Sequence, residues 1–266
     1  MDLSRLFLSC FIIFFAAGAE ASKVWQDIKD SHFVVHYNFK EDLPAVRSVL
    51  RKAEEYYTKI AQQIGYSRYR NFWTWDERVK IIIFPDQETF IRNTNQPAWS
   101  RGYAESDSSL FHSRIIVTYR QEENFLTGLL PHEIGHLILK DFVGFSTSLP
   151  LWFEEGVAQL QESNKKELAG RYLKTLAKSR QYIPLRILMR WDIRKESDGQ
   201  KVKIFYLESV SLVDFMIKTY GSSAFGNFCR NLREGKGFEG SLKSAYTVTI
   251  NSVENLEKKW VEHISR

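Results

Sequence analysis

Two histidines four residues apart, with a glutamate directly after the first, are the side chains of this sequence best suited to chemistry. They lie in the run His132-Glu133-Ile134-Gly135-His136. Residues four apart share one face of an α-helix, so His132 and His136 can offer imidazole nitrogens to one metal ion. Glu133 lies beside that face, where its carboxylate can take a proton from attacking water. The spacing therefore predicts a zinc site with its own general base.

The residues around this run indicate a buried helix, because apolar residues flank the motif on both sides. Buried polar side chains must be hydrogen-bonded or must bind a metal. Pro131 has no N–H group for a helical hydrogen bond. We therefore expect the helix to begin near Thr127 or Gly128, with Pro131 in its first turn, or to be kinked at Pro131.

A catalytic zinc ion also needs a third protein ligand and one open coordination position. Glu155 can supply this ligand, since eighteen residues separate it from His136. Gly144 and the run 146–150 within that segment can reverse the chain and start a second helix across the first. Glu154 is the rival ligand by chemistry alone. The residue pattern thus leaves Glu154 and Glu155 as alternatives.

The combined pattern resembles the gluzincin metallopeptidases, which include thermolysin-like and aminopeptidase N-like enzymes. An HExxH run is followed, after eighteen residues, by a glutamate in W-x-x-E-G-x-A. Residues 150–158 match the P-x-W-x-x-E-G-x-A pattern of the compact, exported peptidase MA-like group. The resemblance implies that one zinc ion is bound by three residues and that Glu133 is the general base. The implied ligands are His132, His136 and Glu155, with Glu154 only a neighbour.

The same resemblance implies that a tyrosine also belongs to the expected site. In aminopeptidase N-like enzymes the oxyanion is stabilised by the tyrosine of a Y-E-K-G-x-x-V helix. The segment that begins at Tyr206 is similar to this helix, with Ser209 in place of the glycine. The resemblance therefore implies that the hydroxyl of Tyr206 is a catalytic hydrogen-bond donor. The alternative is a tyrosine that only packs on an amphipathic helix.

Two other positions depart from the family patterns. Residues 102–105 faintly resemble the segment by which aminopeptidase N-like enzymes hold a substrate amino group, and Glu105 is the corresponding acid or else an ordinary exposed residue. Thermolysin-like enzymes have an acid four residues after the third ligand, which orients a zinc-bound histidine. This chain has Gln159 there, whose amide can still accept a hydrogen bond from an imidazole.

The implied function is a zinc-dependent metallopeptidase that acts on a peptide or protein substrate. Two alternatives remain: a non-catalytic module of the cell envelope that binds a peptide or partner on a gluzincin fold, and a zinc hydrolase of a non-peptide amide. An open three-ligand site favours catalysis, because structural zinc ions normally have four protein ligands. The small size and the weak amine anchor favour an endopeptidase.

The elements that position these residues indicate an α+β fold of the thermolysin-like zincin type. We expect a lobe with a small mixed β-sheet at about 22–140, which contains the active-site helix, and an all-helical lobe at about 145–266. Residues 102–106 and 114–119 are expected to pair as an antiparallel hairpin through a turn at 107–109. The expected strands are 32–37, 79–84, 102–106 and 114–119, and the other expected helices are 43–64, 88–93, 165–179, 203–219, 223–234, 238–246 and 252–264.

Residues 1–21 fit a cleaved secretory signal peptide and leave residues 22–266 as a single domain. Arg5 is followed by an apolar run at 6–17 and by a small-x-small site, so cleavage is expected after Ala21 or, as a second choice, after Ala19. An uncleaved anchor is the minor alternative, because a membrane span needs about 20 apolar residues. We expect a soluble periplasmic or secreted protein.

The remaining composition gives little reason to expect other partners. Cleavage removes Cys10 and leaves Cys229 as a lone thiol, which we expect in the core. The net charge of +5 is mildly basic and is expected to be spread over the surface, so nucleic-acid binding is not predicted. No transmembrane helix is expected in the processed chain, and no oligomeric state is predicted.

Overall fold

A computed structural model describes residues 24–39, 43–66, 73, 77–106, 114–120, 122–246 and 249–265. The expected signal peptide, with Cys10, and the expected turn at 107–109 lie outside these residues. Within the described part of the chain, no helix has both the length and the apolar character needed to cross a membrane.

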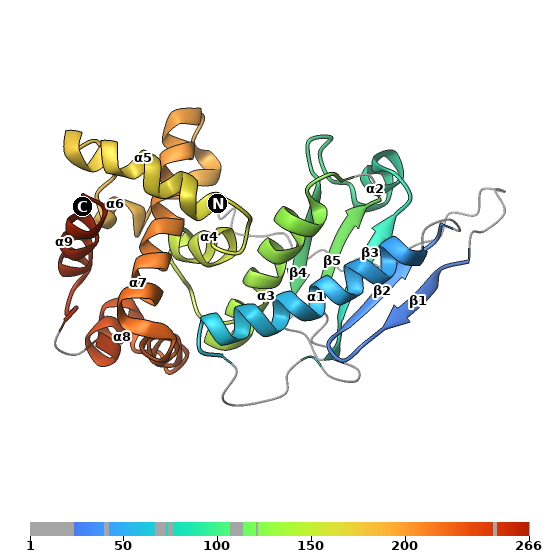
Figure 1. Ribbon diagram of the computed structural model, residues 1–266, viewed down its shortest axis with the longest axis horizontal. Helices are drawn as coiled ribbons and strands as arrows, with labels where there is room; N and C mark the ends of the chain where they lie inside the picture. The colour runs from blue at the N-terminus through green and yellow to red at the C-terminus, as the bar shows by residue number, and fades with distance from the viewer. Residues whose placement is uncertain are drawn as a thin grey trace, which may run out of the picture.

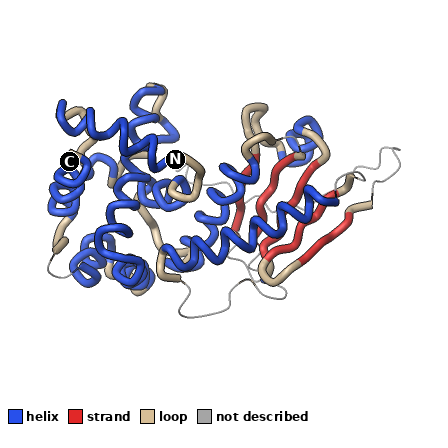
Figure 2. Tube along the Cα trace, in the orientation of Figure 1, coloured by secondary structure: helices blue, strands red, loops and turns tan. Residues whose placement is uncertain are grey.

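A five-stranded mixed sheet forms one end of the molecule (Figures 1 and 2). Its order is β1-β2-β3-β5-β4, in which β2, β3 and β5 are parallel and the two edge strands are antiparallel to their neighbours. The central strands consist mainly of aliphatic residues, as is typical of strands covered on both faces. The strands are β1 (Gln26–Lys29), β2 (Phe33–Tyr37), β3 (Val79–Phe84), β4 (Gly102–Ser106) and β5 (Arg114–Tyr119).

The strand predictions are confirmed, including the antiparallel pairing of β4 with β5. Only β1 was missed, because three of its four residues are exposed and carry no buried alternating pattern. The mixed character of the sheet is also as expected.

Helices cover the two faces of the sheet unequally. One face packs against α1 (Leu43–Gln63) and α3 (Leu130–Val143), through side chains such as Ile81 and Ile116. The other face packs against the short α2 (Gln87–Thr94), through Phe90. The helix that carries both candidate histidines, α3, is thus held directly on the sheet.

A buried ion pair fixes the end of α3 to the sheet. Arg114 of β5 donates a hydrogen bond of 2.8 Å to Asp141 of α3, and both side chains are almost fully buried. The indole N–H of Trp73 donates to the same carboxylate. Because each buried charge has partners, this contact can hold α3 on β5 without leaving an unpaired ion.

The other end of the molecule is helical (Figure 2). Its centre is α7 (Gly199–Arg233), which packs against four other helices of this lobe. The predictions 203–219 and 223–234 are parts of this one helix, which breaks its helical geometry at Gly221, where φ is 83°. The other helices are α4 (Leu151–Gln159), α5 (Lys165–Ser179), α6 (Leu185–Leu188), α8 (Gly237–Tyr246) and α9 (Val253–Ile264).

The remaining helix predictions are confirmed to within one or two residues. The short helix α6 was not predicted. One apolar cluster runs from Phe33 of β2 through α3 and α7 to Trp260 of α9. Cys229 is free and fully buried in this cluster, as expected. The mixed α+β architecture is compatible with the expected fold, in which a sheet with its helices precedes a mostly helical part.

Candidate metal centre

The first two candidate ligands come from the start of α3. A π-helical turn, η2 (Phe125–Leu129), leads directly into α3, and the N–H of Leu130 donates to the carbonyl of Phe125. Pro131 lies in the first turn of α3, and the carbonyl of Thr127, four residues earlier, accepts from the N–H of Ser163 in place of a helical donor. The expected position of Pro131 is confirmed, but the α-helix begins at Leu130 and not at Thr127 or Gly128, because the preceding residues form the π turn.

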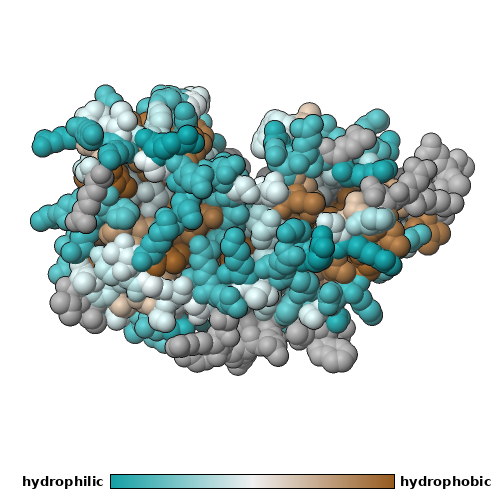
Figure 3. All heavy atoms as spheres, viewed as in Figure 1, coloured by the Kyte–Doolittle hydropathy of each residue, from teal (hydrophilic) through white to brown (hydrophobic). Residues whose placement is uncertain are grey.

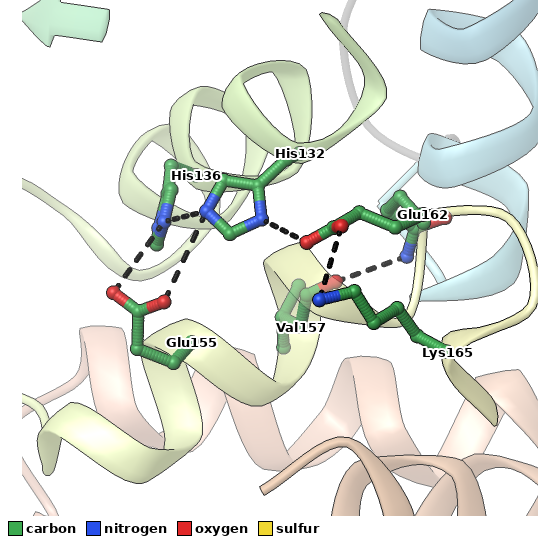
Figure 4. A network of polar contacts seen from close by, with 7 residues as sticks. His132, His136, Glu155, Val157, Glu162 and Lys165 are labelled. Carbon is green, nitrogen blue, oxygen red and sulfur yellow. Dashed lines mark hydrogen bonds and ion pairs between the residues drawn. The ribbon is translucent and has the colours of Figure 1, made fainter. Parts of the chain in front are cut away.

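Three side chains converge beside this turn of α3 (Figure 4). The Nε2 atoms of His132 and His136 are 3.1 Å apart. The Glu155 carboxylate lies 3.9 Å from the Nε2 atom of His132 and 3.8 Å from that of His136. Zinc–ligand bonds of about 2.0–2.1 Å in a tetrahedron separate ligand atoms by about 3.3 Å. The donor types and their spacing therefore fit a zinc ion.

The neighbouring Glu154 does not join this group. Its carboxylate accepts a hydrogen bond of 2.8 Å from the Nζ atom of Lys140, one turn after His136 on α3. Successive residues of α4 point in directions about 100° apart, since a helix has 3.6 residues per turn. Only Glu155 therefore faces the two histidines.

Glycines allow the three helices around the centre to approach closely. A Cβ atom on Gly135 of α3 would lie 3.1 Å from the Cα atom of Ala158 on α4. A Cβ atom on Gly156 of α4 would lie 2.4 Å from the backbone oxygen of Ser209 on α7. Each contact needs a residue without a side chain, so the glycines inside the two motifs set how closely α4 lies between α3 and α7.

A model of the peptidase MA superfamily matches residues 77–265. The chain belongs to the peptidase MA superfamily. Members of this superfamily are usually zinc metallopeptidases. The matched region begins just before β3 and contains all three converging side chains together with the helical lobe. No similar sequence was found among curated proteins.

In this peptidase MA-superfamily chain, Glu133 lies between the histidines and the edge strand β4. Its carboxylate accepts a hydrogen bond from the backbone N–H of Ala104. Burial raises the pKa of Glu133 above its usual value, against the opposing effects of His132 and of this hydrogen bond. A carboxylate with a raised pKa is a stronger base, which suits proton transfer near neutral pH.

The pKa values of the two histidines are shifted in opposite directions. Burial lowers the pKa of His136 to about 3, which keeps the imidazole neutral and able to coordinate a metal. Burial also lowers the pKa of His132, but the hydrogen bond to Glu162 and the charges of the nearby carboxylates outweigh it and raise the pKa overall. The pKa of Glu155 is raised by burial, which the charge of His132 partly offsets.

The partner of His132 is a residue that sequence reasoning missed. The Nδ1 atom of His132 lies 2.9 Å from the carboxylate of Glu162, which also lies 3.4 Å from the Nζ atom of Lys165. Gln159, the expected partner, is buried in α4. Glu162 lies just after the end of α4. The N–H of the next residue, Ser163, donates to the carbonyl of Thr127, so this part of the chain lies against η2.

Tyr206 is brought to the same region by α7. Burial raises the pKa of its hydroxyl, and the charges of Glu155 and Glu162 raise it further. The Tyr206 hydroxyl is thus within electrostatic range of Glu155 and of Glu162. The tyrosine ring is half-buried and packs edge-on against Phe205.

Glu105 is positioned differently from what an amine anchor requires. Successive residues of a strand point to opposite faces. Ala104 packs into the core on the side of α3, whereas Tyr103 packs with Phe90 on the side of α2. Glu105 shares its face with Tyr103, so its side chain points away from α3. This geometry favours the alternative of an ordinary exposed residue.

Proposed function

We propose that this chain is a zinc-dependent metallopeptidase of the gluzincin type, which hydrolyses peptide bonds. The observation that carries the proposal is the convergence of one glutamate and two histidine donor atoms 3.1–3.9 Å apart. His132, His136 and Glu155 would hold the ion. Within the described residues, this group contains three protein donors and no fourth, which favours a catalytic site over a structural one.

Zinc, when bound, supplies a Lewis acid that polarises a carbonyl group and lowers the pKa of water. Glu133 takes a proton from the attacking water and passes it to the leaving nitrogen. Tyr206 donates its hydroxyl to the oxyanion that forms at the scissile carbonyl. A Tyr206→Phe variant that turns over substrate as fast as the wild type would exclude this last role.

Glu162 takes the orienting role that the sequence assigned to Gln159. By accepting from Nδ1–H of His132, its carboxylate selects the tautomer in which the Nε2 lone pair is available to a metal. A carboxylate also makes the imidazole a stronger ligand than an amide would. Lys165 supports this arrangement, because its ammonium group stabilises the negative charge of Glu162.

The edge strand β4 is the expected docking site for the substrate. One side of β4 pairs with β5, and the sheet ends there. The hydrogen bond from Ala104 N–H to Glu133 supports this docking site, because it puts the other side of β4 next to the proposed base. An extended peptide that adds to this edge would pass directly over the base. Because Glu105 points away, we favour cleavage within a chain over removal of its first residue.

The test is a peptide-library digest by the purified protein, repeated with a chelator, after zinc is restored, and with a Glu133→Gln variant. Chelation should abolish cleavage and zinc should restore it. Glu133→Gln should lower turnover about 10²- to 10⁴-fold, the usual contribution of general base catalysis, while zinc content stays equal to that of the wild type. Cleavage that survives both chelation and Glu133→Gln would refute the proposal, and zinc binding without any cleavage would favour the non-catalytic module.

A further inference from the structure

The positive charge of this chain is concentrated in one segment. Residues 165–203 contain twelve Lys and Arg and four Asp and Glu, a net charge of +8. The whole chain carries +5, so all other residues together carry −3. The expectation that the charge is spread evenly is therefore wrong. The segment forms α5, α6 and the start of α7, and the visible surface over α5 is mostly hydrophilic (Figure 3).

Three cations of this segment lie at the edge of the candidate metal centre, and we call them the basic rim. Lys165 begins α5 and contacts Glu162, the partner of His132. Lys203 lies one turn before Tyr206 on α7, so both side chains project from the same face of the helix. Arg194 comes from a third element, the short helix η3 (Ile193–Lys195). The rim consists of Lys165, Arg194 and Lys203.

Local contacts hold two of these rim side chains in place while leaving them open to solvent. The Nζ atom of Lys203 lies 4.6 Å from the centre of the Tyr172 ring, and the Tyr172 hydroxyl accepts a hydrogen bond from the side-chain amide of Gln200. Arg194 donates to Asp192 over 2.7 Å and 3.1 Å, yet 74% of its side chain is exposed. Asp192 uses two of the five N–H donors that a guanidinium offers. Arg194 also lies close enough for its charge to lower the pKa of Glu155.

The acidic side chains of the centre do not neutralise the positive charge of the basic rim. Glu154 is paired with Lys140, and the remaining carboxylates serve the metal, the base and His132. A peptide that lies between β4 and α7 would therefore meet Arg194 and Lys203 as the outermost charges. Charges arranged in this way raise the local concentration of oppositely charged ligands and reject like-charged ones.

We propose that the basic rim selects peptide substrates with acidic side chains next to the bond that is cleaved. This inference rests on the proposed peptidase function. Arg194 and Lys203 bind the carboxylates of the substrate, and the rest of segment 165–203 attracts such peptides over a longer range. A peptide is favoured over other polyanions because Lys165 and Arg194 lie beside the residues of the candidate centre, through Glu162 and Glu155.

Binding by the full chain with Glu133→Gln, in which cleavage is expected to be about 10²- to 10⁴-fold slower, tests the proposal. The probes are three fluorescent peptides of equal length that carry Glu, Gln or Lys on both sides of one common central segment. Fluorescence anisotropy at low salt should show the Glu peptide binding about three- to tenfold more tightly than the Gln peptide, and the Lys peptide most weakly. The differences should shrink at 0.5 M salt, since salt screens exposed charges.

Charge-neutralising variants localise the effect. Arg194→Gln with Lys203→Gln should reduce the preference for the Glu peptide to about twofold or less. The matched control is Lys258→Gln with Lys259→Gln, which removes the same charge from α9, at the far end of the helical lobe (Figure 1). The control should keep the full preference. Lys165 stays unchanged in both variants, because it supports Glu162.

Three results would overturn the proposal. The first two are equal affinity for the Glu and Lys peptides and an equal loss of preference in the rim and control variants. The third is binding to vesicles with anionic lipids but no discrimination among the peptides, which would assign the surface to a membrane. Failure of the wild type to cleave any peptide in the library digest would refute the proposed peptidase function, and this is a separate measurement. Cleavage of peptides without any charge preference would refute only the proposed role of the basic rim and would leave the peptidase function standing.

Discussion

Glu154 and Glu155 are adjacent and chemically identical, yet their carboxylates have different partners. Glu155 faces His132 and His136, whereas Glu154 binds Lys140. The direction of each side chain on α4, and not its chemistry, decides which one is available to a metal. The same holds for the residues that can orient His132, where the Glu162 carboxylate lies 2.9 Å from Nδ1 of His132, while Gln159 is buried in α4.

Substitutions of these three glutamates should affect zinc affinity in a defined order. Glu155→Gln removes a ligand and should weaken zinc binding by more than about 100-fold, while Glu162→Gln should weaken it by about 10- to 100-fold, as loss of an orienting carboxylate does. Glu154→Gln is the control and should leave affinity unchanged. Competition with a chromogenic chelator measures all three constants. Equal effects of Glu154→Gln and Glu155→Gln would contradict the assigned ligand set.

At the scale of elements, the centre depends on how closely α4 lies between α3 and α7. The proposed ligands come from α3 and α4, the hydroxyl of Tyr206 comes from α7, and glycines lie at both crossings. A protein core is close-packed, so a methyl group added at a crossing must push the helices apart.

Gly156→Ala should therefore both destabilise the protein and disturb the centre. Its Cβ atom would lie 2.4 Å from the backbone oxygen of Ser209, and overpacking of this kind costs about 1–3 kcal/mol. Zinc affinity should fall as well, because Glu155 is the preceding residue. Gly170→Ala on α5 is the control: nothing lies within 4 Å of its added Cβ atom, and it should stabilise the helix by up to about 1 kcal/mol. Urea unfolding and chelator competition measure both effects, and equal stabilities of the two variants would contradict the close crossing.

At the scale of the whole molecule, the candidate centre lies where the sheet and its helices meet the helical end (Figure 1). One apolar cluster extends across this junction, from Phe33 to Trp260. A fully buried glutamate on α7 adds a pH-dependent contribution to the stability of this core. Glu208 accepts a hydrogen bond of 2.8 Å from the N–H of Ile183, and burial raises its pKa from 4.5 to about 8.

A raised carboxyl pKa means that the folded protein binds this proton more tightly than the unfolded chain. The resulting stabilisation is complete below about pH 4.5 and is lost as the pH rises to about 8. The free energy of unfolding of the wild type should thus fall, relative to Glu208→Gln, by on the order of 2–5 kcal/mol between pH 4.5 and pH 9. Urea unfolding of both proteins with a chelator present measures this difference. Parallel pH profiles would show that Glu208 titrates normally in the fold.

Local patterns in the sequence were sufficient for much of the fold and for part of the site. The bounds of β3, β4, β5 and α5 follow from alternating or helical apolar spacing, which neighbouring residues determine by themselves. The short, mostly exposed β1 carries no such pattern and was missed. The convergence of His132 and His136 follows from helix periodicity, since residues four apart on any helix share a face.

Contacts between segments distant in the sequence required the tertiary structure. The contact between Glu162 and His132 exists because the chain after α4 folds back to η2, and the orientation of Glu105 depends on which face of the sheet α3 covers. The basic rim likewise combines cations from α5, η3 and α7. Local periodicity determines which residues share one face of one element, whereas the packing of helices and strands decides which faces meet.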